Sequence, residues 1–216
     1  MKSKIALVLG ATGLVGQKLV EKLTIDERYE SILIINRREV NYTHPKIQEK
    51  VIDFDKINES IKQVNATDLF CCVGTTIKTA GSQEAFRKVD FDIPVNFGKI
   101  AKRSEIQNFV IISSIGANSK SSTFYSKVKG EVEDQLSALR IPHLTILRPS
   151  LLLGNRDEKR LGEGIAQVLF SCFGFLMVGP LKKYKAIPAS QVAKAMIHYA
   201  NNPSETVIEN NYLHQV

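Results

Sequence analysis

Short apolar runs alternate with amphipathic helical patterns over the first two-thirds of the chain. The run at residues 5–9 is unbroken, as expected for a strand buried on both faces of a sheet. A helical pattern follows it, with apolar residues on one face at Leu14, Val15, Leu19, Val20 and Leu23. Further strands are predicted at residues 31–35, 50–52, 69–73, 109–112 and 144–147, with a helix at 124–139. This alternation predicts an α/β fold built on a doubly wound parallel sheet.

The pattern changes after Pro149. Residues 151–216 hold an apparent helix, a short extended piece at 185–187 and a second helix at 190–200. Because so short a segment is small for an independent domain, we expect one domain over residues 1–216. Residues 1–150 would form its core, and residues 151–216 a small C-terminal capping segment over the carboxyl edge of the sheet.

The stretch 164–181 is the most apolar part of the chain. It also contains Gln167, Ser171, three glycines and Pro180, whereas a spanning helix needs about 20 predominantly apolar residues. We therefore expect a core or subunit-interface helix, so a homodimer surface is one expectation, and no integral membrane association. Peripheral attachment to a membrane remains the alternative.

The charge balance narrows the choice of partners. There are 29 Lys and Arg against 22 Asp and Glu, a formal net charge of +7. The basic residues are spread along the chain without a run that interleaves with aromatics, so we expect no nucleic-acid partner. Three cysteines without Cys/His spacing fit neither a disulfide framework nor a zinc site, so we expect no metal. Free thiols and the absence of a secretory pattern at the first residues predict a cytoplasmic protein.

A glycine-rich loop follows the first predicted strand directly. Its sequence, Gly10-Ala11-Thr12-Gly13-Leu14-Val15-Gly16, lies between a buried strand and an amphipathic helix, which is the context of a dinucleotide-binding loop. Gly10 would allow the tight turn, Gly13 a close approach of the backbone to a pyrophosphate, and Gly16 close packing of the helix on the sheet. The start of the helix would offer free N–H groups to phosphates. An ordinary strand–turn–helix remains the simpler alternative.

The end of the second predicted strand indicates which dinucleotide is bound. NAD enzymes place an acid there on the ribose 2′-hydroxyl. This chain instead has Asn36-Arg37-Arg38, and no acid until Glu39. Guanidinium groups suit a 2′-phosphate, which a carboxylate would repel, so the sequence favours NADP, as NADPH or its oxidised form. The alternative is that the arginines only solvate the end of a strand.

Tyr125 and Lys129 are the candidates for redox chemistry. They are four residues apart and therefore on one face of the predicted helix. A nearby ammonium stabilises a phenolate, so the tyrosine could exchange a proton with a carbonyl or an alcohol while hydride moves at the nicotinamide. Ser114, after the fifth strand, would hydrogen-bond the reacting oxygen. Ser113 is adjacent, and alternation along the strand should point only one of the two into the site.

These segments together resemble the short-chain dehydrogenase/reductase superfamily, in its atypical branch, and in particular the Tat-interacting-protein oxidoreductase group. The matching segments are GATGLVG at 10–16, NRR at 36–38, CCVGTT at 71–76, VIISSIGA at 110–117, YSKVKGEVE at 125–133 and LRPSLLLG at 147–154. The resemblance implies a Rossmann fold that binds NADP, with Ser114, Tyr125 and Lys129 as the active-site set and Lys129 also holding the nicotinamide ribose.

The resemblance also assigns residues to each part of the cofactor. The residues that it places on the pyrophosphate are Gly10, Thr12, Gly13, Leu14 and Val15. Those that it places on the 2′-phosphate, the adenine and the ribose, in that order, are Arg37 and Arg38, Asp53 and Phe54, and Cys72, Val73 and Gly74.

Three functions are compatible with these residues. The first is an NADP-dependent oxidoreductase that acts on an unidentified small carbonyl or alcohol. The second is a sugar-nucleotide epimerase or dehydratase, which usually needs a larger substrate domain. The third is an NADPH sensor that binds a partner protein without turnover, for which an intact Tyr–Lys pair would serve no purpose.

Overall fold

The computed structural model describes residues 3–154, 184–204 and 206–216, and within them a seven-stranded parallel sheet dominates. Its strands, in spatial order, are β3 (Ile47–Val51), β2 (Tyr29–Asn36), β1 (Lys4–Leu9), β4 (Asp68–Cys71), β5 (Asn108–Ile112), β6 (His143–Arg148) and β9 (Val207–Glu209). The order reverses next to β1, so the chain winds outward from the middle of the sheet in both directions. This confirms the doubly wound parallel sheet of a Rossmann fold.

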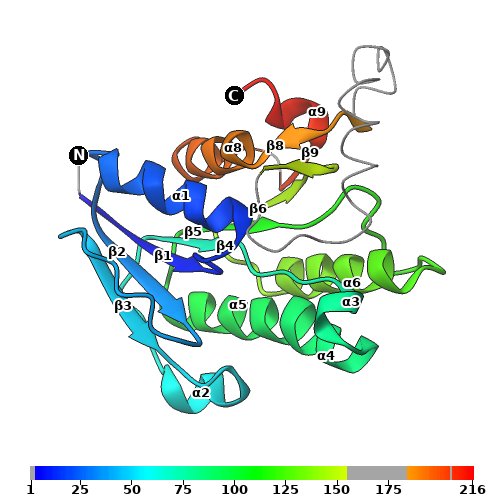
Figure 1. The fold of residues 1–216 in the computed structure, drawn as a ribbon, viewed down its shortest axis with the longest axis horizontal. Coiled ribbons are helices and arrows are strands. Elements are labelled where there is room, and N and C mark those ends of the chain that lie inside the picture. Colours follow the sequence, from blue (N-terminus) through cyan, green and yellow to red (C-terminus); the bar gives the residue numbers. More distant parts are fainter. Residues whose placement is uncertain (1–2, 155–183, 205) are drawn as a thin grey trace.

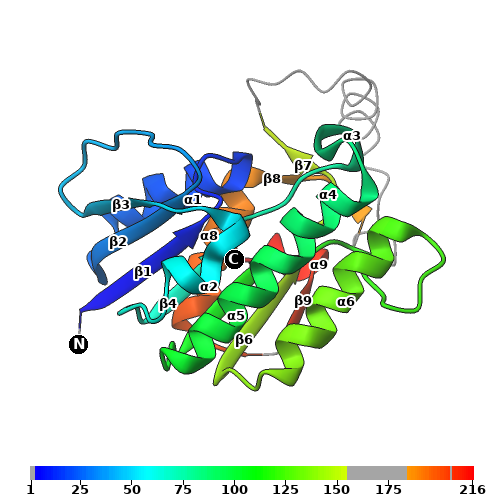
Figure 2. The same cartoon turned by 90° about the horizontal axis from the view of Figure 1, so that it is seen from below.

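Helices cover both faces of the sheet (Figure 1). On one face α1 (Leu14–Ile25) and α8 (Ala189–Asn201) lie together over the apolar residues of β1 and β2. On the other, α5 (Ile93–Arg103) and α6 (Phe124–Ala138) lie side by side across the strands, as Figure 2 shows. The strands β1, β2, β4, β5 and β6 are covered on both sides because each contributes residues to two apolar cores, whereas the edge strand β3 is largely exposed.

Short helices connect β4 to α5 and β3 to β4. The connection after β4 contains α3 (Ile77–Ala80), α4 (Gln83–Arg87) and a single π-helical turn at Lys88–Asp92 that leads directly into α5. A 3₁₀ turn (Phe54–Lys56) and α2 (Ile57–Ser60) follow β3. The π-helical turn adds a residue to the helical ladder, and such bulges are frequent at functional sites.

The described part of the C-terminal segment contributes to the helical layers and to the sheet. In it α8 packs against α1 on a face of the sheet, and β9 extends the sheet beside β6. The buried side of α8 includes Ala189, Ala193 and Ala200, small residues that allow two helices to approach closely. A second, two-stranded sheet pairs β7 (Leu152–Leu153) with β8 (Ile187–Pro188), and α9 (Asn210–Leu213) ends the described chain.

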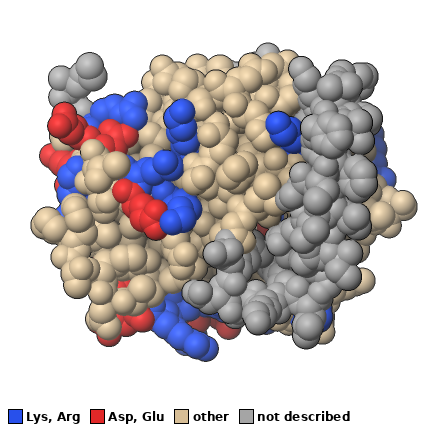
Figure 3. Space-filling model, turned by 45° about the horizontal axis from the view of Figure 1, so that its top comes forward, with Lys and Arg blue, Asp and Glu red and all other residues tan. Residues whose placement is uncertain are grey.

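The apolar stretch 164–181 lies outside the described residues, and so do the expectations made for it. In the described ranges no helix is both long and apolar enough to cross a membrane. On the face drawn in Figure 3, Lys and Arg side chains lie in separate groups, with Asp and Glu side chains among them on one side. The described Lys and Arg side chains therefore form no continuous positive patch on that face.

Candidate functional site

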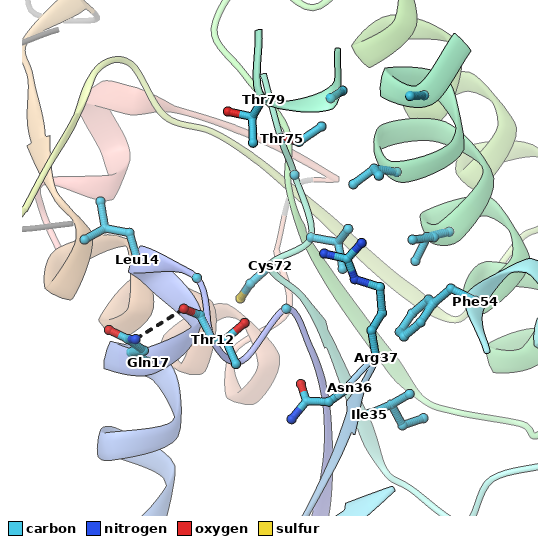
Figure 4. Close-up of a pocket in the computed structure, with 18 residues that line it drawn as sticks. Thr12, Leu14, Gln17, Ile35, Asn36, Arg37, Phe54, Cys72, Thr75 and Thr79 are labelled. Carbon is cyan, nitrogen blue, oxygen red and sulfur yellow. Dashed lines mark hydrogen bonds between the residues drawn. The ribbon is translucent and has the colours of Figure 1, made fainter. Parts of the chain in front are cut away.

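A cavity of about 690 Å³ opens where β1, β2 and β4 end, at the point where the strand order reverses. Open α/β sheets bind their ligands at this position. The cavity is lined by Gly10, Thr12, Gly13, Leu14, Gln17, Ile35, Asn36, Arg37, Phe54, Cys72, Val73, Gly74, Thr75, Thr79, Ala80, Ala85, Val89 and Ile93 (Figure 4).

The glycine loop between β1 and α1 forms one wall of this cavity. Gly10 has φ +75°, and a Cβ there would lie 2.7 Å from the backbone carbonyl carbon of Cys72, so both conformation and space require glycine. A Cβ on Gly16 would lie 2.1 Å from the Gly10 carbonyl oxygen. These contacts bring the start of α1 against the end of β1, as the glycine spacing predicts.

No side chain caps the first turn of α1. Gly13 occupies the N-cap position and has no side chain to cap the helix, and the first turn holds no acidic residue. Free N–H groups and the positive end of the helix dipole are suited to an anion such as a phosphate. This observation, with the close-packed glycines beside it, fits the pyrophosphate of a dinucleotide.

The end of β2 forms a second wall. Asn36 and Arg37 line the cavity, and Figure 4 shows the Arg37 side chain pointing into it beside Phe54. Arg38 is exposed and is not part of the lining. Asp53 is also exposed and caps the following 3₁₀ turn by accepting a hydrogen bond from the Asp55 amide at 2.9 Å. The structure therefore distinguishes Arg37 from its neighbour, which the sequence could not do.

Tyr125 and Lys129 lie on α6, and their environments differ. Tyr125 is 38% exposed, with its ring centroid 5.7 Å from that of Phe86. Lys129 is buried, and its Nζ lies 2.7 Å from Oδ1 of Asp90, which is buried too. Burial alone would lower the pKa of Lys129, but Asp90, with a smaller contribution from Tyr125, outweighs it and raises that pKa. The lysine is therefore an ammonium held in a buried ion pair.

Asp90 is the residue of this site that sequence reasoning missed. It lies on the π-helical turn Lys88–Asp92, and its other oxygen accepts a hydrogen bond from the Thr75 amide at 2.7 Å. A Cβ on Gly74, which lines the cavity, would lie 3.4 Å from Asp90 Oδ1 and 3.9 Å from Lys129 Nζ. The ion pair is thus next to the cavity. No local pattern singles it out, because Lys88 and Asp92 beside it are charged as well.

Ser113 and Ser114 also have different surroundings. Ser113 is buried and donates a hydrogen bond to Glu133, which receives two further hydrogen bonds from Arg148 at the end of β6. Ser114 is half-buried, and its hydroxyl has a long, 3.3 Å hydrogen bond to the Ile115 carbonyl oxygen. The hydroxyl of Ser113 is therefore used in a structural hydrogen bond, and that of Ser114 is the more available of the two for a ligand.

The Glu133–Arg148 pair fixes α6 to the sheet. Glu133 follows Tyr125 and Lys129 on the same helix at intervals of four residues, so all three lie on one face. Arg148 also donates to Glu209 on β9, at 3.1 Å. Hydrogen bonding to Glu133 raises the pKa of Arg148 above its usual range. The network ties β5, β6 and β9 to the helix that carries the candidate catalytic side chains.

The structure brings most, but not all, of the expected cofactor residues to one cavity. Those in its lining are Gly10, Thr12, Gly13, Leu14, Arg37, Phe54, Cys72, Val73 and Gly74. Those outside the lining are Val15, which is buried in the core, Arg38 and Asp53. Tyr125, Lys129 and Ser114 are not in the lining either, although Lys129 adjoins it through Gly74. The lining residues to which the sequence assigned no role include Gln17, Asn36, Thr75 and Thr79.

The vicinal cysteines have no features of a reactive pair. Cys71 is fully buried in β4, and burial raises the pKa of its thiol to about 12. The thiol of Cys72 lies 3.6 Å from Met196 Sδ, and burial raises its pKa as well. Within residues 3–154, 184–204 and 206–216, no three His, Cys, Asp or Glu side chains are grouped so that they could hold a metal ion.

Comparison with known proteins agrees with this geometry. A family model described as NAD(P)H-binding matches residues 10–203. The chain is 36% identical over 206 residues to protein FMP52, mitochondrial, of Debaryomyces hansenii, covering 92% of this chain and 88% of that protein. It is 32% identical over 213 residues to protein HTATIP2 of Rattus norvegicus, covering 97% and 86%.

A solved structure shows the same fold. The enzyme WbmH of Bordetella bronchiseptica, determined in complex with NAD⁺, superposes with a TM-score of 0.70 at 14% identity, over 95% of this chain and 75% of that one.

The names of the relatives correct one expectation. Several yeast relatives are named as mitochondrial proteins, which points to mitochondria, so the prediction of a cytoplasmic location was wrong. It failed because free thiols and ordinary composition do not distinguish the cytoplasm from other reducing compartments. The sequence matches and the cavity at the switch point of the sheet agree on the family: the chain belongs to the NAD(P)H-binding family and is related to HTATIP2 and FMP52.

Proposed function

We propose that this protein is an NADP-dependent oxidoreductase that transfers hydride to or from a small carbonyl or alcohol. The observation that carries the proposal is the extent of this cavity. It includes the phosphate-binding glycines at one side, Arg37 at the end of β2, and Gly74, which adjoins the Lys129–Asp90 pair. Phosphate binding and selection of the 2′-phosphate would therefore be served by one cavity, and proton chemistry by residues that adjoin it near Gly74.

Each group has a separate role in the proposal. The amides of Leu14 and Val15 at the start of α1 bind the pyrophosphate, and Thr12 lines the loop beside them. Arg37 binds the 2′-phosphate with a charged fork of donors, and Arg38 adds positive potential from the surface. Asp53 and Phe54 flank the adenine, while Cys72, Val73 and Gly74 lie along the ribose.

The nicotinamide, when bound, supplies or accepts the hydride. Tyr125 donates a proton to the substrate oxygen or removes one from it, and Ser114 hydrogen-bonds that oxygen. Lys129, held by Asp90, offers its remaining donors to the ribose hydroxyls. Because Asp90 is 2.7 Å from the ammonium, the pair keeps Lys129 charged without leaving an uncompensated charge next to the substrate.

The test is NADPH oxidation across a panel of small carbonyl compounds by the wild type and by Tyr125→Phe. We expect the variant to lose about a hundredfold or more in turnover, a common size for the loss of a general acid, while its NADPH affinity changes by less than about twofold. Retained turnover in Tyr125→Phe would refute the proposed mechanism.

Cofactor choice has its own test. Arg37→Gln should weaken NADPH binding by about ten- to a hundredfold, because a hydrogen bond to a charged group contributes roughly 1.5–3 kcal/mol, and should leave NADH binding nearly unchanged. Arg38→Gln is the matched control, and we expect a smaller effect because Arg38 lies outside the cavity lining. Equal losses for NADH and NADPH in Arg37→Gln would contradict selection of the 2′-phosphate.

A second candidate function is NADPH binding without turnover. The observation in its favour is the same ion pair, because Lys129 already has an anionic partner and needs no substrate or phenolate beside it. The two candidates differ in one measurement. A protein that binds NADPH in a titration, yet oxidises none of it with any carbonyl in the panel, would support the sensor.

A further inference from the structure

Glu49 connects both ends of the loop that carries Arg37. It lies on β3, opposite Ile34 of β2 in the strand register. Its Oε1 accepts hydrogen bonds from the side-chain amide of Asn36 at 2.6 Å and from the backbone amide of Val40 at 2.9 Å. Its Oε2 accepts a hydrogen bond from the backbone amide of Asn41 at 3.1 Å. One carboxylate therefore binds three donors.

These three donors enclose Arg37 and Arg38. Asn36 ends β2 and is only 6% exposed, so the near end of the loop is anchored in the sheet. At the far end, Asn41 has φ +59°, a left-handed conformation that turns the chain and aims its amide at the carboxylate. Residues 37–40 are exposed, and without Glu49 the amides of Val40 and Asn41 would lose the acceptor that holds them.

A fixed loop matters for a charged ligand because ordering a side chain costs free energy on binding. An arginine side chain and its backbone lose conformational freedom when they hold a phosphate, and a loop that is already ordered has less to lose. Asn36, the near end of the loop, is itself in the lining of the cavity beside Arg37. Glu49 is outside that lining, so it would act on a ligand only through the loop.

We propose that Glu49 is a positioning residue that sets the preference for NADPH over NADH, by holding the loop of residues 36–41 so that Arg37 meets the 2′-phosphate. This inference rests on the proposed binding of NADP. Its expected effect is opposite to the one that electrostatic repulsion alone would produce. A carboxylate near a 2′-phosphate should weaken NADPH binding by repulsion, so removing its charge would strengthen binding if Glu49 acted only through its field.

The experiment compares Glu49→Gln with the wild type by titration of NADPH and NADH. Glutamine keeps the shape of the Glu49 side chain, but its amide nitrogen replaces one of the two carboxylate oxygens. At that position a donor then faces the donor that the oxygen had accepted from. We expect NADPH to bind about tenfold more weakly, the usual effect of losing a charge-assisted hydrogen bond, and NADH to change by less than about twofold. Glu39→Gln, which removes an exposed carboxylate from the same loop, is the matched control and should leave NADPH binding unchanged or slightly tighter.

A double variant separates positioning from a general structural effect. If Glu49 acts through Arg37, then Glu49→Gln adds almost no further loss of NADPH affinity in an Arg37→Gln background, because interacting residues are not additive. Tighter or unchanged NADPH binding by Glu49→Gln would overturn the inference. So would equal losses for both nucleotides, or full additivity with Arg37→Gln. A wild type without any preference for NADPH would instead refute the proposed cofactor, and the inference with it.

Discussion

Replacing Asp90 by Asn tests whether the buried ion pair next to the cavity controls the charge of Lys129. The substitution keeps the size of the side chain and removes its charge. With the two charges 2.7 Å apart, their attraction is about 6 kcal/mol at an effective dielectric constant of about 20. In the wild type this attraction offsets the cost of taking both groups out of water. In Asp90→Asn the ammonium keeps its own desolvation cost and loses the partner.

The expected loss of stability is about 3–5 kcal/mol, the usual cost of removing one partner of a buried ion pair and leaving the other charge buried without compensation. Its upper limit is set by deprotonation. At pH 7, removing the proton from a lysine with an ordinary pKa near 10.4 costs about 5 kcal/mol, at 1.4 kcal/mol per pH unit. If burial of the unpaired ammonium cost more than this, Lys129 would lose its proton in the folded state instead.

This limit gives a pH signature with a definite sign. In the wild type Asp90 raises the pKa of Lys129, so the pair stays charged at neutral pH and its contribution is lost only above the unfolded value of the lysine pKa. In the variant, burial without Asp90 lowers that pKa. The folded state then binds fewer protons than the unfolded state, and stability rises with pH by up to about 1.4 kcal/mol per unit.

The assay is urea unfolding between pH 6 and pH 9, with Asp92→Asn as control. Asp92 is on the same π-helical turn but is exposed, so its substitution should change stability by less than about 0.5 kcal/mol at every pH. The reasoning is refuted if the destabilisation by Asp90→Asn does not depend on pH, or if it equals that of the control.

Three other perturbations have clear expected outcomes. In Gly16→Ala, the new Cβ would lie 2.1 Å from the Gly10 carbonyl oxygen, so the loop must move; we expect a loss of about 1–3 kcal/mol in urea unfolding together with loss of NADPH binding in a titration. Arg148→Met leaves the buried carboxylate of Glu133 without its partner and should lower the free energy of unfolding by about 3–5 kcal/mol. Arg148→Lys should recover only part of this loss, because lysine lacks the guanidinium fork that binds both carboxylate oxygens. Wild-type stability in Arg148→Met would contradict this reasoning. The pKa of Cys71 is raised to about 12, so the folded thiol keeps a proton that the unfolded thiol loses near pH 9. Its contribution to the free energy of unfolding is therefore present below about pH 9 and is lost as the pH rises toward 12. The urea midpoint should fall less between pH 8 and pH 10 in Cys71→Ala than in the wild type.

The sheet could be predicted from the sequence wherever a strand is buried on both faces. Such strands are continuous apolar runs, and the expected segment 5–9 differs from β1 by one residue. β9 could not be predicted, because Val207–Glu209 has only three residues and no run to distinguish it from a loop. Its place in the sheet depends on pairing with β6, which no local pattern records.

The site divides in the same way. The glycine spacing has a local steric cause, so the sequence alone indicated the loop and its role. The choice between Arg37 and Arg38 depends on which direction the chain takes after β2, and that direction is set by contacts with Glu49 on another strand. Asp90 was missed for a similar reason. Its importance comes from Lys129, which is far away in the sequence and meets it only when α6 packs beside the π-helical turn.

The two halves of the site therefore depend on different forces, and this has a consequence for variants. Contacts at the glycine loop are steric and made by the backbone, so they are insensitive to pH and respond to any added side-chain atom. The Lys129–Asp90 and Glu133–Arg148 pairs are electrostatic, and both hold the helix that carries Tyr125. Substitutions in the first group should abolish nucleotide binding, whereas conservative ones in the second should leave the nucleotide bound while altering turnover and its pH dependence. The presence of the Lys129–Asp90 pair is compatible with both an enzyme and a sensor. The effect of its substitution on turnover, measured with the nucleotide still bound, therefore bears directly on whether this protein is an enzyme.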